Sequence, residues 1–209
     1  MVHKSIVSTN SLKKGRNNMN IAIELIKLPY EAKVALANDK QASPEFLAVL
    51  ATDNDARIRE NVALNSGTPS EVLDALANDG DSVVRKAIAE NKNTSADSLT
   101  VLAKDKDSTV RFNVARNENT PIELLAMLAK DDKKWIRIAV AANRNASANI
   151  LAELAKDVDI DVRCMVTDNK NTSVKTLVFL SKDNNEWVSE AAIKALSKDK
   201  GKSKNSIER

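Results

Sequence analysis

The sequence predicts an all-helical solenoid, a stack of short repeats in which each unit buries its apolar side only against its neighbours. The first observation is a 26-residue period that continues through the chain without a gap. The second is a pair of leucines three positions apart in each unit, the spacing of one helical face. The third is the scarcity of glycine and proline, four of each, which disfavours the many tight turns of a β-sandwich. The period aligns columns of aspartate (Asp53, Asp79, Asp105, Asp131, Asp157, Asp183), arginine (Arg59, Arg85, Arg111, Arg137, Arg163) and asparagine (Asn65, Asn91, Asn117, Asn143, Asn169).

The register predicts a single solenoid domain over residues 21–199, flanked by two basic tails. Its units are a capping helix at 21–28, full repeats at 27–52, 53–78, 79–104, 105–130, 131–156 and 157–182, and a partial repeat at 183–199. In the partial repeat, Ser189 and Ala195 stand in the arginine and asparagine columns, and such a degenerate last unit is typical of a solenoid cap. Residues 1–20 and 200–209 are polar and aperiodic, and we expect the first of these tails to be disordered.

Each repeat contains two helical segments, and the second begins with a strong start signal. Thr68, Pro69 and Glu71 match a capping box with the threonine as N-cap, and Thr120-Pro121-Ile122-Glu123 repeats the pattern. In the unit that carries Ala146, the start is expected to move to Ser147. The leucine pairs that follow are Leu47/Leu50, Leu73/Leu76, Leu99/Leu102, Leu125/Leu128, Leu151/Leu154 and Leu177/Leu180.

The first segment, for example residues 55–64, places Ile58, Arg59, Val62 and Ala63 on one side of a helix. An aspartate at its start can cap it. The asparagine at its end is expected to form the turn, since asparagine tolerates the left-handed conformation. Two helices in one short repeat leave little room for loops, so an alternative is that one of the two segments is a 3₁₀ helix rather than an α-helix.

The repeat resembles a known family. The unit reads Asp105-x5-Arg111-x2-Val114-Ala115-x-Asn117-x2-Thr120-Pro121-x-Glu123-x-Leu125-x2-Leu128-Ala129. It is similar to the leucine-rich repeat variant, and the resemblance covers residues 27–199. The resemblance implies a right-handed, HEAT-like superhelix of alternating α and 3₁₀ helices and a general role in macromolecular binding. The founding member of the family carries an iron–sulfur module ahead of its repeats. This chain has no cysteine there, so no cluster and no other cofactor is expected.

The arginine column is predicted to be a structural ladder. Arg59 falls on the apolar side of its segment, where a charge needs a partner, and the aspartate column (Asp79, Asp105, Asp131 and the others) supplies one in each unit. The alternative is that these arginines contact phosphate. The asparagine column is likewise interpreted as turn structure.

The outward face of the first segment is the variable surface of the array. Phe112, Trp135, Ile138 and Trp187 lie on it, and large apolar residues that face outward indicate a partner site. The alternative is that this face packs inward on adjacent helices and that the tryptophans belong to the core.

No catalytic motif accompanies these columns. His3 is the only histidine, and neither a Cys/His cluster nor a glycine-rich phosphate loop is present. We therefore expect a non-enzymatic scaffold that binds a protein through the variable face.

One alternative is nucleic-acid binding by the lysine column (Lys104, Lys130, Lys156, Lys182) and the basic tails. Against it, an aspartate follows each of these lysines, and residues 21–197 hold 23 basic and 27 acidic residues. Another alternative is an alkylpurine DNA glycosylase type of enzyme, because Trp135, Asp161 and Trp187 share one column.

A cytoplasmic location is expected. No apolar run approaches the roughly 18 residues of a membrane span, and residues 1–20 lack the apolar core of a signal peptide. The single cysteine, Cys164, agrees with a reducing compartment. Neither a metal nor a membrane partner is predicted.

Overall fold

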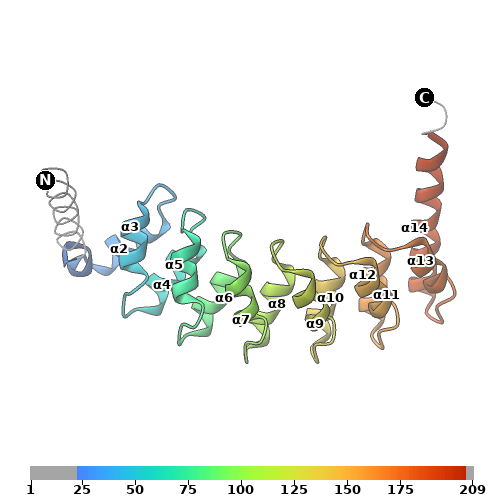
Figure 1. Cartoon of the computed structure of the whole chain (residues 1–209), viewed down its shortest axis with the longest axis horizontal. Helices are drawn as coiled ribbons and strands as arrows, with labels where there is room; N and C mark the ends of the chain where they lie inside the picture. The colour runs from blue at the N-terminus through green and yellow to red at the C-terminus, as the bar shows by residue number, and fades with distance from the viewer. Residues whose placement is uncertain (1–22, 206–209) are drawn as a thin grey trace, which may run out of the picture. The chain divides into compact units, whose positions relative to one another are not determined.

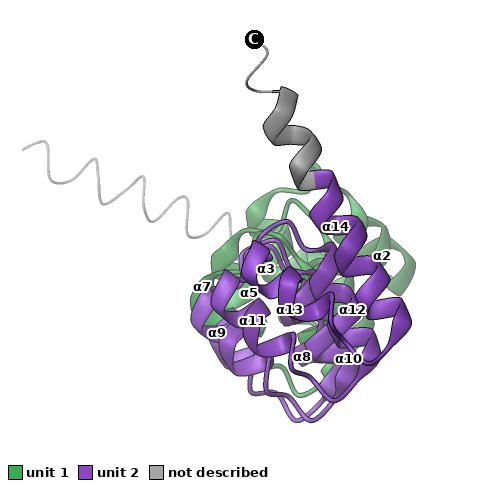
Figure 2. Ribbon diagram, turned by 90° about the vertical axis from the view of Figure 1, so that its right-hand side faces the viewer, with its two compact units in different colours: residues 1–98 green, residues 99–209 purple. Residues whose placement is uncertain are grey.

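The computed structural model describes residues 23–205, with side chains as far as residue 198. Every regular element in this part of the chain is helical, which confirms the all-α solenoid predicted from the period. Contacts divide the chain into two compact units, residues 1–98 and 99–209 (Figure 2). Helix α7 (Ala96–Leu102) contains the division between them. The prediction of a single domain over residues 21–199 stays a prediction.

Longer and shorter helices alternate along each unit (Figure 1). In unit 1, helical residues 23–27 are followed by α2 (Tyr30–Asn38), α3 (Pro44–Leu50), α4 (Ala56–Leu64), α5 (Ser70–Leu76) and α6 (Ser82–Glu90). Unit 2 contains α8 (Ser108–Arg116), α9 (Ile122–Leu128), α10 (Lys134–Ala142), α11 (Ala148–Leu154), α12 (Ile160–Asp168), α13 (Val174–Leu180) and α14 (Glu186–Asn205). Both classes are α-helical, and no 3₁₀ helix occurs between residues 23 and 205.

The core of each unit lies between the two classes of helix. In unit 2, α8, α10, α12 and α14 pack in sequence, while α9 contacts α8 and α10, and α11 contacts α10 and α12. In unit 1, α2, α4 and α6 pack in the same way. Both leucines of every predicted pair are buried, which confirms the apolar stripe of the second segment. Valine and isoleucine of the first segment, such as Val114 and Ile136, complete each layer.

The predicted capping box at the second segment is wrong in one respect. Thr120 is 1% exposed, and its hydroxyl donates to the carbonyl of Val114 at 2.5 Å instead of accepting from the following helix. Thr68, Thr94 and Thr172 make the equivalent bond. The threonine therefore satisfies a carbonyl at the end of the first helix, where water has little access. The N-cap is the next residue: Ser147, as expected, accepts from the backbone N–H of Ile150.

The asparagine turn also differs from its prediction. Asn143 has φ −68° and ψ 131°, which is extended backbone, and no described non-glycine residue has a positive φ. Its side chain accounts for its presence instead. The carbonyl Oδ1 accepts from the backbone N–H of Asn145 at 2.8 Å. The amide donates to two carbonyls of the preceding repeat, those of Ala115 at 2.8 Å and Asn117 at 3.1 Å. The asparagine thus joins adjacent repeats.

The last helix departs from the repeat pattern. At the place where Ala195 replaces the turn asparagine, α14 continues to Asn205 and passes the predicted end of the solenoid at residue 199. The predicted tail at residues 1–20 lies outside the described part of the chain, as do residues 206–209.

Candidate protein-binding surface

The arginine column joins successive repeats. Arg111 of α8 donates through Nε and Nη2 to the two carboxylate oxygens of Asp131, at 2.7 and 3.0 Å. Its Nη1 donates to the carbonyl of Asp105 at 2.9 Å, within its own repeat. The carboxylate of Asp131 also accepts from the backbone N–H of Lys133, at 3.0 Å. Nε and Nη2 of the guanidinium therefore bind the next repeat in a bidentate pair, and Nη1 binds the turn that precedes α8.

The same geometry recurs along both units. Arg59 pairs with Asp79, Arg137 with Asp157 and Arg163 with Asp183, each at 2.6–2.7 Å from Nε to the carboxylate. In the first repeat, Lys33 takes the arginine position and bonds Asp53 at 2.7 Å. Arg85 is 7% exposed and donates to the carbonyl of Asp79 at 2.7 Å. Asp105 accepts from the backbone N–H of Asp107 at 2.8 Å.

These pairs shift the acidity of the carboxyl groups. The hydrogen bond from Arg59 is the main cause that lowers the pKa of Asp79, and Arg163 lowers the pKa of Asp183 in the same way. At Asp131, burial raises the pKa, but the net shift is downward, with the hydrogen bonds from Arg111 and the Lys133 backbone as the first of several lowering causes. The side chains of Arg111 and Arg137 are only 16% and 14% exposed. Because their N–H groups are already hydrogen-bonded to aspartates and carbonyls, the arginines of the column have little capacity to contact phosphate.

The variable face lies on the longer helices of unit 2. Phe112 belongs to α8, Trp135 and Ile138 belong to α10, and Trp187 belongs to α14. We call these four residues the tryptophan face. Trp135 is 45% exposed and Trp187 is 74% exposed, whereas Phe112 and Ile138 are half-buried. The tryptophans are therefore not core residues in this unit.

Polar groups surround the tryptophan face. On α12, between the helices that carry the two tryptophans, Asp161 accepts from Lys134 Nζ at 3.0 Å. Asp159 lies 3.1 Å from the same nitrogen, and the two carboxylates, Asp161 first, raise the pKa of Lys134. Beside Phe112, the guanidinium of Arg116 lies 5.5 Å from the ring centroid. Cys164 continues the column of Phe112 and Ile138, and burial raises the pKa of its thiol.

A second set of exposed apolar side chains lies on the shorter helices of unit 2, and the sequence reasoning missed it. Its members are Ile122 and Met127 on α9 and Val174, Val178 and Phe179 on α13, between 38% and 55% exposed. Met127 and Phe179 share one column of the period, so this signal was available in the sequence. The leucine stripe drew attention to the buried side of these helices alone.

The described part of the chain contains neither a metal-binding cluster nor a membrane-spanning helix. No group of three or more His, Cys, Asp or Glu side chains there is arranged to hold a metal ion. Between residues 23 and 205, no helix combines the length and apolar character needed to cross a membrane.

Comparison with known proteins agrees with the repeat geometry. Residues 56–81, one repeat in length, match the model of the leucine-rich repeat variant family. A solved structure described as a leucine-rich repeat variant with a novel repetitive structural motif is 27% identical to the chain. That match covers 82% of this chain and 69% of the other, with a TM-score of 0.64. An archaeal HEAT-like repeat protein from Thermococcus onnurineus NA1 is 16% identical over 87% of this chain and 79% of its own, with a TM-score of only 0.29. No curated protein matches the chain significantly. The resemblance indicated by the sequence is thereby confirmed: residues 56–81 match the leucine-rich repeat variant family, and the chain has the fold of a solved leucine-rich repeat variant.

Proposed function

We propose that the chain is a non-enzymatic scaffold that binds a protein partner through the tryptophan face. The observation that carries the proposal is the exposure of Trp135 and Trp187, 45% and 74%, on two of the longer helices of unit 2. Exposed tryptophans commonly dominate the energy of protein interfaces because they bury a large area at little cost in side-chain entropy. Phe112 and Ile138 extend the apolar area next to Trp135 on two helices that pack together.

The charges around the face agree better with a protein than with a nucleic acid. Asp161 and Asp168 of α12 and Glu190 of α14 lie on the same side of the longer helices as the tryptophans. Phosphate groups would be repelled by these carboxylates. The ladder arginines do not offset this repulsion, because they are engaged with aspartates and turn carbonyls. As part of the same proposal we place the protein in the cytoplasm.

The proposal includes the absence of catalysis. The glycosylase alternative needs a free carboxylate between two tryptophans, and Asp161 is instead bonded to Lys134 at 3.0 Å. Incubation with methylated DNA should release no alkylated base. Release that is abolished by Asp161→Asn would replace the scaffold proposal with the enzymatic one.

The binding surface is tested by comparing three single variants of the full chain: Trp135→Ala, Trp187→Ala and, as a matched control, Phe179→Ala. Phe179 is an aromatic residue of unit 2 with 55% exposure, but it lies on a shorter helix. A partner captured by the wild-type chain should be lost by both tryptophan variants and kept by the control. For the isolated partner, each tryptophan variant should lose at least about 2 kcal/mol of binding free energy, or about 30-fold in Kd.

The opposite pattern would reject the tryptophan face. It consists of unchanged binding together with a loss of several kcal/mol of folding stability in Trp135→Ala, as expected for a core residue. Equal loss of binding in Phe179→Ala would move the site to the shorter helices.

A further inference from the structure

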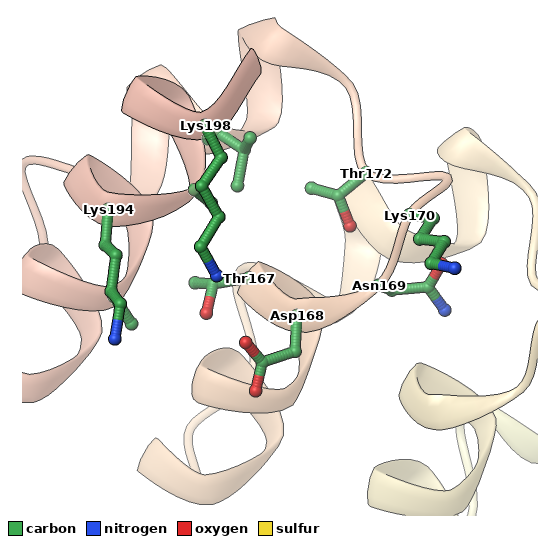
Figure 3. A pocket seen from close by; sticks show the side chains of 10 residues that line it. Thr167, Asp168, Asn169, Lys170, Thr172, Lys194 and Lys198 are labelled. Atoms are coloured by element: carbon green, nitrogen blue, oxygen red, sulfur yellow. The ribbon is translucent and has the colours of Figure 1, made fainter. Parts of the chain in front are cut away.

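A groove of about 370 Å³ lies at the end of unit 2, between the end of α12, the turn at residues 169–173 and α14 (Figure 3). Its origin is visible in the sequence. Ala195 stands where each of the five preceding repeats has its turn asparagine, and α14 continues as a helix instead of turning there. The space that a further turn would fill therefore stays open.

The preceding repeats show what normally fills this space. The amide of Asn169 donates to the carbonyls of Ala141 at 2.6 Å and Asn143 at 2.9 Å. The amide of Asn171 donates to the carbonyls of Arg144 at 2.6 Å and Ala146 at 3.0 Å. Each turn thus presents main-chain oxygens to the N–H groups of the next one.

By the same register, the next acceptors are the carbonyls of Thr167, Asn169, Lys170 and Thr172, and all four residues line the groove. Ala195 has no amide to offer them, and the hydroxyl of Ser197 donates to the carbonyl of Lys194 within α14. Among the described residues, no side chain donates to these four carbonyls. This side of the groove is consequently suited to N–H donors.

Lysines supply the charge of the groove. Lys198 extends from α14 toward the end of α12, where Thr167 and Asp168 lie (Figure 3). Lys194 of α14 and Lys170 of the turn also line the groove. In the part of the chain with described side chains, none of these lysines has a carboxylate within 4.0 Å. Three lysines against the single carboxylate of Asp168 favour an anionic ligand.

We propose that this groove binds an acidic peptide segment. Main-chain or side-chain N–H groups of the peptide would donate to the row of carbonyls, and its carboxylates would meet Lys194 and Lys198. A bare phosphate would satisfy the lysines only, since its oxygens are acceptors and the carbonyls would repel them. The groove volume accommodates a few residues of an extended peptide. None of the four residues of the tryptophan face lines the groove, so this proposal does not rest on the proposed function.

The test measures binding of two fluorescent probes to the full chain: a short peptide of alternating Asp and Asn, and an oligothymidylate of similar charge. The peptide should bind more tightly than the oligonucleotide. The double variant Lys194→Glu/Lys198→Glu should weaken peptide binding by at least about tenfold, because it removes two attractive charges and adds two repulsive ones. Lys130→Glu, at an exposed lysine of unit 2 outside the groove, is the matched control and should leave binding unchanged.

A second variant tests the groove itself without changing charge. Ala195→Phe fills the space between α14 and the turn and should also abolish peptide binding, while circular dichroism verifies that the helices remain folded. Tighter binding of the oligothymidylate, equal peptide affinity of the charge-reversed and control variants, or undiminished binding by Ala195→Phe would each overturn the proposal.

Discussion

Two of the side chains that hold successive repeats together, the arginine of the ladder and the turn asparagine, each combine a contact within their own repeat with a contact outside it. Arg111 closes the turn at Asp105 and reaches Asp131, twenty residues further along the chain. Asn143 shapes its own turn and reaches two carbonyls of the preceding repeat. Substitution of either residue therefore disturbs two repeats at once, which explains why both columns persist while the outward positions vary.

Arg111→Ala should destabilise the protein by about 3–5 kcal/mol, because the carboxylate of Asp131 is only 8% exposed and would remain charged without its partner. Lys130→Ala, at an exposed position of the lysine column, is the control and should change stability by less than about 0.5 kcal/mol. Urea denaturation of the purified chains gives both values. An Arg111→Ala curve that coincides with the wild-type curve would show that the arginines are free surface groups.

At the scale of the helix, two kinds of hydroxyl precede the shorter helices. Ser173 is an N-cap, and its Oγ accepts from the backbone N–H of Thr176 at 3.1 Å. Thr120 donates its hydroxyl to the carbonyl of Val114 and is 1% exposed. Both residues satisfy the same statistical preference for Ser or Thr before a helix, but only the first uses the lone pairs that define a cap.

Replacement of each residue by aspartate should separate these roles. Aspartate is an N-cap of equal quality, so Ser173→Asp should be nearly neutral. Thr120→Asp places a carboxylate that cannot donate against a buried carbonyl, and it should cost at least about 3 kcal/mol. Thermal unfolding of the two variants gives the comparison. Similar melting temperatures would mean that Thr120 is a cap after all.

The same helices show what the sequence could and could not predict. Period and apolar spacing predict the helices, their order and the buried leucines, because those depend on which residues share a face. The sequence places the start of α9 one residue too early. The same Thr-Pro-x-Glu pattern is compatible with a capping threonine and with a threonine whose hydroxyl bonds a buried carbonyl. The inter-repeat role of Asn143 depends on a backbone that lies close in space but 26 residues away, and no local rule reports it. The exposure of Trp135 likewise depends on how the neighbouring helices pack against α10, which the sequence of that helix does not specify.

In the molecule as a whole, ion pairs between a basic residue of one repeat and an aspartate of the next recur in both units. Asp53 and Asp79 belong to unit 1, and Asp131 and Asp183 belong to unit 2. The pKa of each of these carboxyl groups is lowered from an ordinary value of 3.8. At Asp53 burial raises the pKa, but the hydrogen bonds from Lys33 and the backbone N–H of Asp55, with the nearby charges of Lys33 and Arg59, lower it overall.

This distribution predicts a common acid sensitivity. A carboxyl group with a lowered pKa in the folded state binds fewer protons than its unfolded counterpart, so its stabilisation is complete above a pH of about 4 and is lost as the pH falls further. The free energy of unfolding should therefore decline steeply between about pH 4 and pH 2, with both units affected.

Asp79→Asn should lower stability at pH 7 and should flatten the acid decline, because one of the titrating groups is gone. Asp97→Asn, at an exposed aspartate of α7 outside the ladder, is the control for the lost charge. Urea denaturation across this pH range measures the slopes, and an Asp79→Asn slope equal to that of the wild type would place the acid sensitivity outside the ladder.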